Sequence, residues 1–198
     1  MTESDVIDTL AGLTPDSPVA AIRDRKPVTR QHAQASYRAL FEPSDPGDVT
    51  PRERFAIATF FAGLHAQNAA TVFYAAGLTR TSPPEGFVAA LRAEIDSGRT
   101  TGPYGAYPKG PLSAEDVAGP IYHGADSVLG AKLAAALAHV HMLVFHPRDA
   151  NAAALQRLLD AGWSNAGIVT LSQLVAFLAF QIRAAAGLRT LAATEGAT

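Results

Sequence analysis

Apolar residues recur along the chain at intervals of three and four, and no long stretch alternates apolar with polar residues. Intervals of three and four place side chains on one face of an α-helix, whereas alternation is typical of a β-strand. The pattern therefore predicts an all-α helical bundle of about eight helices. Their expected ranges are 4–12, 28–42, 51–77, 83–97, 113–118, 126–146, 150–161 and 164–187.

Three segments carry residues that commonly begin a helix: "TPRE" at 50–53, "SPPE" at 82–85 and a looser version, "SAED", at 113–116. The hydroxyl at the N-cap bonds a free backbone N–H, proline suits the first helical position, and glutamate two positions later closes a capping box. The caps support the helix starts that the periodicity predicts. Gly187 is a plausible residue to end the last helix.

The segment "SGRTTGPYGAYPKGPL", residues 97–112, is rich in glycine and proline and is expected to be an irregular loop. A loop of this length in a compact domain is usually functional or disordered, and its two tyrosines favour an ordered lid or a subunit contact. We expect one domain over residues 1–198, with 1–49 as an N-terminal helical extension.

Composition and charge limit the kinds of partner that the chain is expected to bind. Hydrophobic residues make up 48% of the 198 and charged residues 17%, so a homo-oligomer that covers part of the surface is expected. The net charge of −2, without a run of Lys or Arg, gives nucleic-acid binding no electrostatic footprint. The chain has no cysteine, which excludes disulfides, thiolate metal sites and thiol redox cycles.

Two segments bear on localisation. The start, "MTESDVIDTL", lacks the basic and apolar regions of a signal peptide. The segment "AGIVTLSQLVAFLAFQI" is nearly apolar enough for a membrane helix, but it contains Thr170, Ser172, Gln173 and Gln181. We expect a cytoplasmic protein in which this segment is a buried or interface helix, and membrane association is the least favoured alternative.

The stretch "FFAGLHAQNAA" holds candidate chemistry, because His65 and Asn68 fall on one side of a helix. Glu53 lies twelve residues earlier, roughly 18 Å away on a straight helix. A turn at Gly63 would fold Glu53 back beside the His65 turn. The plainer interpretation is that Glu53 is only a capping residue and that His65 and Asn68 face solvent.

Two segments resemble a known family. "RERFAIATFFAGLHAQNAATVFYAAGL" resembles the core of AhpD-like alkylhydroperoxidases and carboxymuconolactone decarboxylases. "AALAHVHMLVFHPRDANAAALQRLLDAGWSNAGIVTLSQLVAFLAFQIRAAAGLR" resembles the C-terminal pattern of the same family. The resemblance implies an AhpD-like helical bundle that assembles as dimers, trimers or hexamers.

The family motif places a glutamate at Glu53, two cysteines at His65 and Asn68, and a histidine at Val72. Only the glutamate is present, so the thiol peroxidase cycle is predicted to be absent. The decarboxylase branch works without cysteine. In that branch His65 would be the acid–base group, and Arg52 or Arg54 would hold a carboxylate.

Three further histidines occur in "LAHVHMLVFHP", at 139, 141 and 146. No two have the i, i+4 spacing of a metal pair on a helix, so we expect boundary histidines and no metal or cofactor. His146 before Pro147 is expected to end its helix. Trp163 is expected to staple onto Ile168 around an N-cap at Ser164.

The sequence leaves two leading functions open. One is a peroxidase-related protein without redox cysteines that acts on a small organic acid or lactone through the Glu53/His65 region. The other is a non-catalytic small-molecule-binding or structural oligomer. A His65 ring buried in a pocket with Glu53 and Asn68 within reach would favour the enzyme.

Overall fold

The computed structural model describes residues 5–195, and within that range it contains nine α-helices, two 3₁₀ turns and no β-strand. The all-α prediction is confirmed. The helices are α1 (Val6–Ala11), α2 (Pro18–Asp24), α3 (Pro27–Phe41), α4 (Pro51–Leu64), α5 (Asn68–Arg80), α6 (Phe87–Gly98), α7 (Ala131–Phe145), α8 (Ala152–Asp160) and α9 (Asn165–Glu195), with 3₁₀ turns η1 (Pro111–Glu115) and η2 (Pro147–Asp149).

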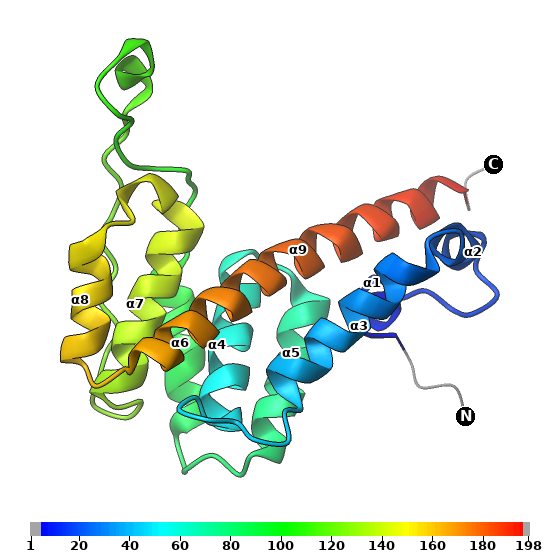
Figure 1. Cartoon of the computed structure of the whole chain (residues 1–198), viewed down its shortest axis with the longest axis horizontal. Coiled ribbons are helices and arrows are strands. Elements are labelled where there is room, and N and C mark those ends of the chain that lie inside the picture. The colour runs from blue at the N-terminus through cyan, green and yellow to red at the C-terminus, as the bar shows by residue number, and fades with distance from the viewer. Residues whose placement is uncertain (1–4, 196–198) are drawn as a thin grey trace.

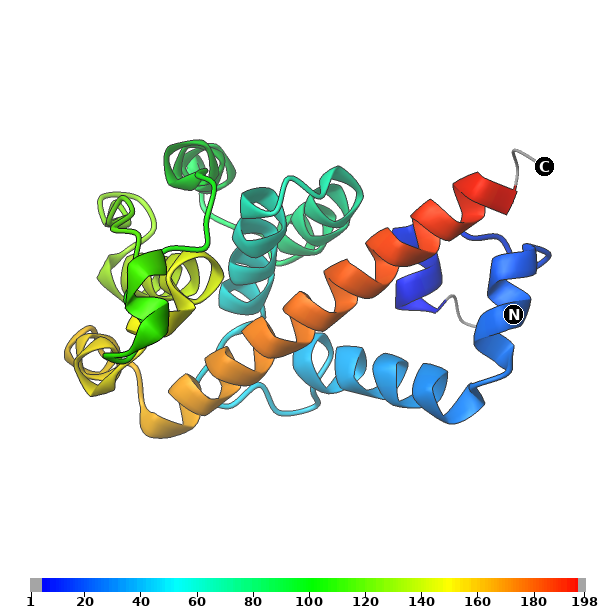
Figure 2. The same ribbon diagram turned by 90° about the horizontal axis from the view of Figure 1, so that it is seen from above.

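The long helix α9 crosses the whole molecule (Figures 1 and 2). It has 31 residues, which corresponds to about 46 Å. Helices α7 and α8 pack on its N-terminal end, α4 packs on its middle, and α1 to α3 pack near its C-terminal end. The chain therefore has two ends, an α7–α8 end and an α1–α3 end, that α9 connects.

Helix α4 is the centre of the core. Every residue from Arg54 to Leu64 is buried, and α5, α6, α7 and α9 all contact this helix. Two glycines allow the close approach. A Cβ at Gly77 would lie 2.2 Å from the Phe55 ring, and one at Gly63 would lie 2.6 Å from Ile95. Gly63 is thus needed for packing, and the helix does not break there.

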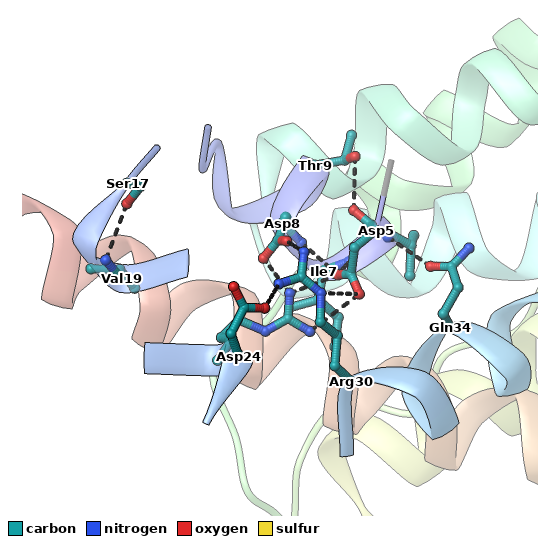
Figure 3. A network of polar contacts seen from close by, with 11 residues as sticks. Asp5, Ile7, Asp8, Thr9, Ser17, Val19, Asp24, Arg30 and Gln34 are labelled. Atoms are coloured by element: carbon teal, nitrogen blue, oxygen red, sulfur yellow. Dashed lines mark hydrogen bonds and ion pairs between the residues drawn. The ribbon is translucent and has the colours of Figure 1, made fainter. Parts of the chain in front are cut away.

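A network of charged side chains holds α1, α2 and α3 together (Figure 3). Asp5 and Asp8 of α1 both pair with Arg23 of α2, and Asp8 also pairs with Arg30 of α3. Arg30 reaches the exposed carboxylate of Asp24 at 2.6 Å as well. Each charged group in this network has a partner of opposite sign, so the network stabilises structure.

Several predicted boundaries are wrong. The sequence analysis did not predict α2, although Ser17 caps it and Pro18 occupies its first position. The "SPPE" segment is a turn, because Ser82 has a positive φ of 49° and α6 begins only after Gly86. The predicted helices at 113–118 and 126–146 are the 3₁₀ turn η1 and a helix that begins at Ala131.

Helix α9 continues past Gly187 to Glu195, so the predicted end is wrong. The Arg189 guanidinium holds this extension, since it donates to Leu10 O at 3.1 Å and to Gln67 Oε1 at 2.5 Å. In the part of the chain that the structure describes, α9 is the one helix long and apolar enough to cross a membrane. Half of that stretch is buried against the protein, as in a core helix.

The predicted irregular loop is confirmed and is longer than expected, since only η1 interrupts the chain between α6 and α7. Its outer part stands away from the helices (Figure 1). Its base is fixed to the end of α7. Tyr104 N donates to Phe145 O at 2.6 Å, and the Arg148 guanidinium lies 3.9 Å from the centre of the Tyr107 ring.

Candidate functional site

Helices α4 and α5 form a helix–turn–helix, but the turn lies at residues 65–67 and not at Gly63. Ala66 provides the reversal with a positive φ of 52°. His65 therefore follows the last turn of α4, while Glu53 lies in the first turn of the same helix, roughly 18 Å away. The expectation that the turn brings Glu53 beside His65 is wrong.

Glu53 serves the start of α4, as the capping box predicts. Its carboxylate accepts hydrogen bonds from Thr50 N at 2.7 Å and Thr50 Oγ1 at 2.9 Å. The same carboxylate lies 2.8 Å from Lys132 Nζ of α7. Its hydrogen-bonding capacity is therefore used in fastening α4 to α7.

His65 is half-buried and lies away from both hollows described below. Its ring stacks on Phe61 with centroids 4.4 Å apart, and Nδ1 lies 2.9 Å from Phe61 O. Burial lowers the pKa of His65, the bond to Phe61 O opposes the shift, and Arg183 adds to it. Asn68 is exposed at the first position of α5.

The two arginines predicted to hold a carboxylate bind backbone carbonyls. Arg54 is buried and donates to Val49 O at 2.9 Å, Leu40 O at 2.7 Å and Pro46 O at 2.8 Å. Arg52 reaches Ser82 O at 3.2 Å. Arg54 therefore organises the connection between α3 and α4, and its donors do not face a ligand.

A hollow lies at the α7–α8 end, between these helices and the segment 120–123. We call it the histidine cavity, and its volume is about 500 Å³. Its walls are formed by Pro120, Ile121, Tyr122, His123, Ala135, Ala138, His139, His141, Met142, His146, Asp149, Asn151, Ala154 and Arg157.

His141 belongs to the fixed wall of the histidine cavity. Its Nε2 lies 2.9 Å from Gly98 O, and its ring stacks on Tyr122 with centroids 4.9 Å apart. Burial lowers the pKa of His141, and nearby His146 lowers it further, against the bond to Gly98 O. The Tyr122 hydroxyl donates to Glu94, and burial, this bond and the Glu94 charge raise the pKa of Tyr122.

His146 follows α7 as the residue pattern predicts, and it fastens the loop to the helix. Its Nδ1 lies 3.1 Å from Asp149 Oδ2, and its Nε2 lies 3.1 Å from Pro120 O. Both partners are hydrogen-bond acceptors, and each lies within hydrogen-bond distance of one of the two ring nitrogens. His146 thus holds one wall of the histidine cavity in place.

His139 differs from these two histidines. It lies on the cavity wall, and no residue between 5 and 195 forms a hydrogen bond with its ring. Burial lowers the pKa of His139, and the positive charge of Arg157 lowers it further. Arg157 lines the same cavity from α8, and no carboxylate in the described range pairs with it. The cavity is therefore lined by the His139 imidazole and by the guanidinium of exposed Arg157, neither of which has a hydrogen-bond or ion-pair partner within the described range.

An open apolar groove of about 490 Å³ adjoins the cavity between α7, α8 and α9, and His139 and Asn151 line both hollows. We call it the tail groove. Asn151 is committed to structure, because its side chain caps α8 at Ala154 N, 3.0 Å away. The other residues of the tail groove are Leu143, Ala150, Leu155, Ser172, Val175, Ala176 and Ala179.

No family model, no curated protein and no solved structure matches the chain. The resemblance to AhpD-like proteins therefore stays a prediction. The geometry of the cavity is the basis on which a function is proposed below.

Three histidines of the cavity form a visible cluster in the sequence. The sequence does not show that their roles differ. His141 and His146 are fixed by carbonyls of distant segments, whereas His139 is not. Arg157 gave no sequence signal. Within residues 5–195 no group of three or more His, Asp or Glu side chains is placed to hold a metal ion.

Proposed function

We propose that the protein binds a small organic acid in the histidine cavity, with Arg157 holding the carboxylate and His139 as the acid–base group. The observation that carries the proposal is that His139 of α7 and Arg157 of α8 line the same cavity, and that neither side chain has a hydrogen-bond or ion-pair partner within residues 5–195. Arg157 is exposed, so its guanidinium is accessible from solvent. A guanidinium commonly binds a carboxylate through two hydrogen bonds, and pockets of this size suit small ligands.

The positive charge of Arg157 favours an anion beside His139, and the carboxylate on the cavity wall, Asp149, is bonded to His146. Arg157 disfavours protonation of His139 in the free protein. A carboxylate between the two would offset the charge of Arg157 and would raise the pKa of His139. Binding is therefore expected to take up a proton, and affinity is expected to rise as the pH falls toward 6.

Thermal shift with matched acids and amides tests the proposal. Hexanoate and benzoate at millimolar concentration are expected to raise the Tm, because a ligand that binds only the folded state stabilises it. Hexanamide and benzamide, which have the same shape and no charge, are expected to have little effect. Equal shifts for acids and amides, or no shift with any acid, would contradict the proposal.

The proposal extends to lactone hydrolysis. Neutral His139 takes a proton from water as the water oxygen attacks the lactone carbonyl, the ring C–O bond breaks, and the leaving oxygen takes the proton back. The new carboxylic acid then releases its proton to solvent, and Arg157 holds the resulting carboxylate. The measurement is consumption of simple γ- and δ-lactones by the wild type and by His139→Gln, which is expected to abolish turnover. Equal rates for the two proteins would remove the catalytic part of the proposal.

The proposal keeps the predicted family resemblance but moves the site to another part of the chain. We propose a scaffold related to AhpD-like proteins without their thiols, with its site in the C-terminal half and not at Glu53 and His65. The all-α fold and the α4–α5 helix–turn–helix support it. The proposed site needs no metal or cofactor.

A structural oligomer in the cytoplasm is the second candidate function, and three exposed apolar residues on α9 favour it. Val169, Phe180 and Leu191 are exposed on this helix. Light scattering on the protein purified without detergent gives the mass directly. Phe180→Glu is expected to shift an oligomer toward monomer, whereas a monomeric wild type would contradict this candidate.

A further inference from the structure

We infer that the ligand is an amphipathic carboxylate, whose charged head lies at Arg157 and His139 and whose hydrocarbon tail lies in the tail groove. This inference rests on the proposed function. It adds the chemical class of the ligand, which the histidine cavity alone does not specify.

The first observation is that the two hollows are neighbours. His139 and Asn151 line both the histidine cavity and the tail groove, so the groove borders the cavity at the His139 side of the proposed head site. Because Asn151 is occupied with capping α8, His139 is the polar group at the junction that is free to meet a ligand. The inferred ligand would pass between α7 and α8, beside His139 and Asn151, to place its tail in the groove.

The second observation is the contrast in chemistry between the two hollows. The histidine cavity carries Arg157, Asp149 and several imidazoles, whereas the tail groove is lined mainly by aliphatic side chains, including Leu143, Leu155 and Val175. Ser172 is the groove's hydroxyl, and it donates to Ile168 O at 2.8 Å within its own helix. The groove thus presents little unsatisfied polarity to a ligand and suits an alkyl or aryl tail.

The third observation is exposure. Leu155 of α8 is 43% exposed at the edge of the groove. A tail lying against it and Val175 would remove apolar surface from water. Each methylene group that becomes buried contributes a free energy that corresponds to roughly two- to fourfold in affinity. Affinity is therefore expected to increase with chain length.

Calorimetric titration with acetate, hexanoate, octanoate and 1-octanol tests the inference. For the wild type, affinity is expected to rise from acetate to octanoate, and octanol is expected to bind at least tenfold more weakly than octanoate. Arg157→Gln is expected to weaken hexanoate and octanoate by a similar factor. Octanol binding as tightly as octanoate would overturn the placement of the head.

Ala176→Trp fills the groove from an exposed position on α9, and Ala166→Trp is its matched control on the exposed surface of the same helix. The first variant is expected to abolish the dependence on chain length and to leave acetate binding unchanged. The control is expected to behave as the wild type. Leu155→Ser gives a second, smaller change in the groove, with a loss for octanoate only.

The possible outcomes distinguish a failure of the tail inference from a failure of the proposed function. If all the carboxylates bind with one affinity, or if Ala176→Trp keeps the chain-length dependence, the tail inference fails and the proposed function stands. If no carboxylate binds the wild type, the proposed function fails and the tail inference fails with it.

Discussion

The two ends of the molecule treat charge in opposite ways. At the α1–α3 end, Asp5 and Asp8 pair with Arg23 and Arg30 in a closed network (Figure 3). At the α7–α8 end, Arg157 faces a cavity without a partner in the described range. Paired charges of this kind hold helices together, whereas an unpaired charge beside a cavity is available to a ligand.

The candidate residues in α4 differ from Arg157 in the same way. Glu53 and Arg54 have suitable chemistry, but a capping box, Lys132 and three backbone carbonyls already use their hydrogen-bonding groups. Residue type identifies a candidate, and the partners in the fold decide its role. Substitutions of groups that have partners in the fold and of groups that do not are expected to have different effects.

The largest effect is expected from Arg54→Ala. The change removes the donors of three carbonyls, that of Val49 buried and those of Leu40 and Pro46 partly buried, so the free energy of unfolding is expected to fall by about 3 kcal/mol. Chemical denaturation measures it. The control is Arg92→Ala, an exposed position on α6, which is expected to change stability by less than about 0.5 kcal/mol. A loss for Arg54→Ala no larger than that of the control would contradict a structural role.

The second effect concerns Asp8→Ala in the α1–α3 network. It removes the carboxylate that Arg23 and Arg30 share, and a loss of about 2 kcal/mol in unfolding free energy is expected. Asp24→Ala removes an exposed member of the same network and is expected to cost less than about 0.5 kcal/mol. Carboxylate binding is expected to stay unchanged in both variants, and similar losses in the two would refute this account of the network.

The third effect is expected on ligand affinity and not on stability. Arg157→Gln is expected to lower the affinity for hexanoate about tenfold, equivalent to about 1.4 kcal/mol, and to leave the unfolding free energy within about 0.5 kcal/mol of the wild type. Calorimetry and denaturation on the same samples measure both quantities. A variant that loses stability and keeps its affinity would show that Arg157 is structural.

The smallest effect is a pH dependence of stability. Burial is the main cause that lowers the pKa of His65, His139 and His141 in the folded protein, so the unfolded chain binds these protons more readily. The free energy of unfolding is therefore expected to fall as the pH drops from 7 to 5, through the ordinary histidine pKa near 6.5. His139→Gln is expected to reduce this slope, and His32→Gln, at an exposed position on α3, serves as the control. A slope that His139→Gln leaves unchanged would contradict the shift.

Local signals in the sequence predicted the helices better than their junctions. The "TPRE" cap gave the start of α4, because its four residues satisfy one another. The "SPPE" segment has the same pattern but forms a turn, with Ser82 and Gly86 both at positive φ. The continuation of α9 past Gly187 depends on hydrogen bonds from Arg189 to Leu10 and Gln67, which lie far away in the chain. A local sequence pattern does not contain such contacts.

The candidate site was less predictable than the fold, because the roles of its residues also depend on contacts with distant segments of the chain. Gly63 suggested a turn, but its lack of a side chain admits Ile95 from α6. The three histidines near the end of α7 look alike in sequence. Their roles depend on Gly98, Pro120 and Arg157, which approach from separate segments.

The most direct test of the central claim is a pH titration of the His139 imidazole by NMR, with and without saturating hexanoate. His139→Gln assigns the resonance, and Arg157→Gln serves as the comparison. The account predicts a pKa below the ordinary histidine value in the free protein and a higher pKa with hexanoate bound. The same pKa in both states of the wild type would contradict it.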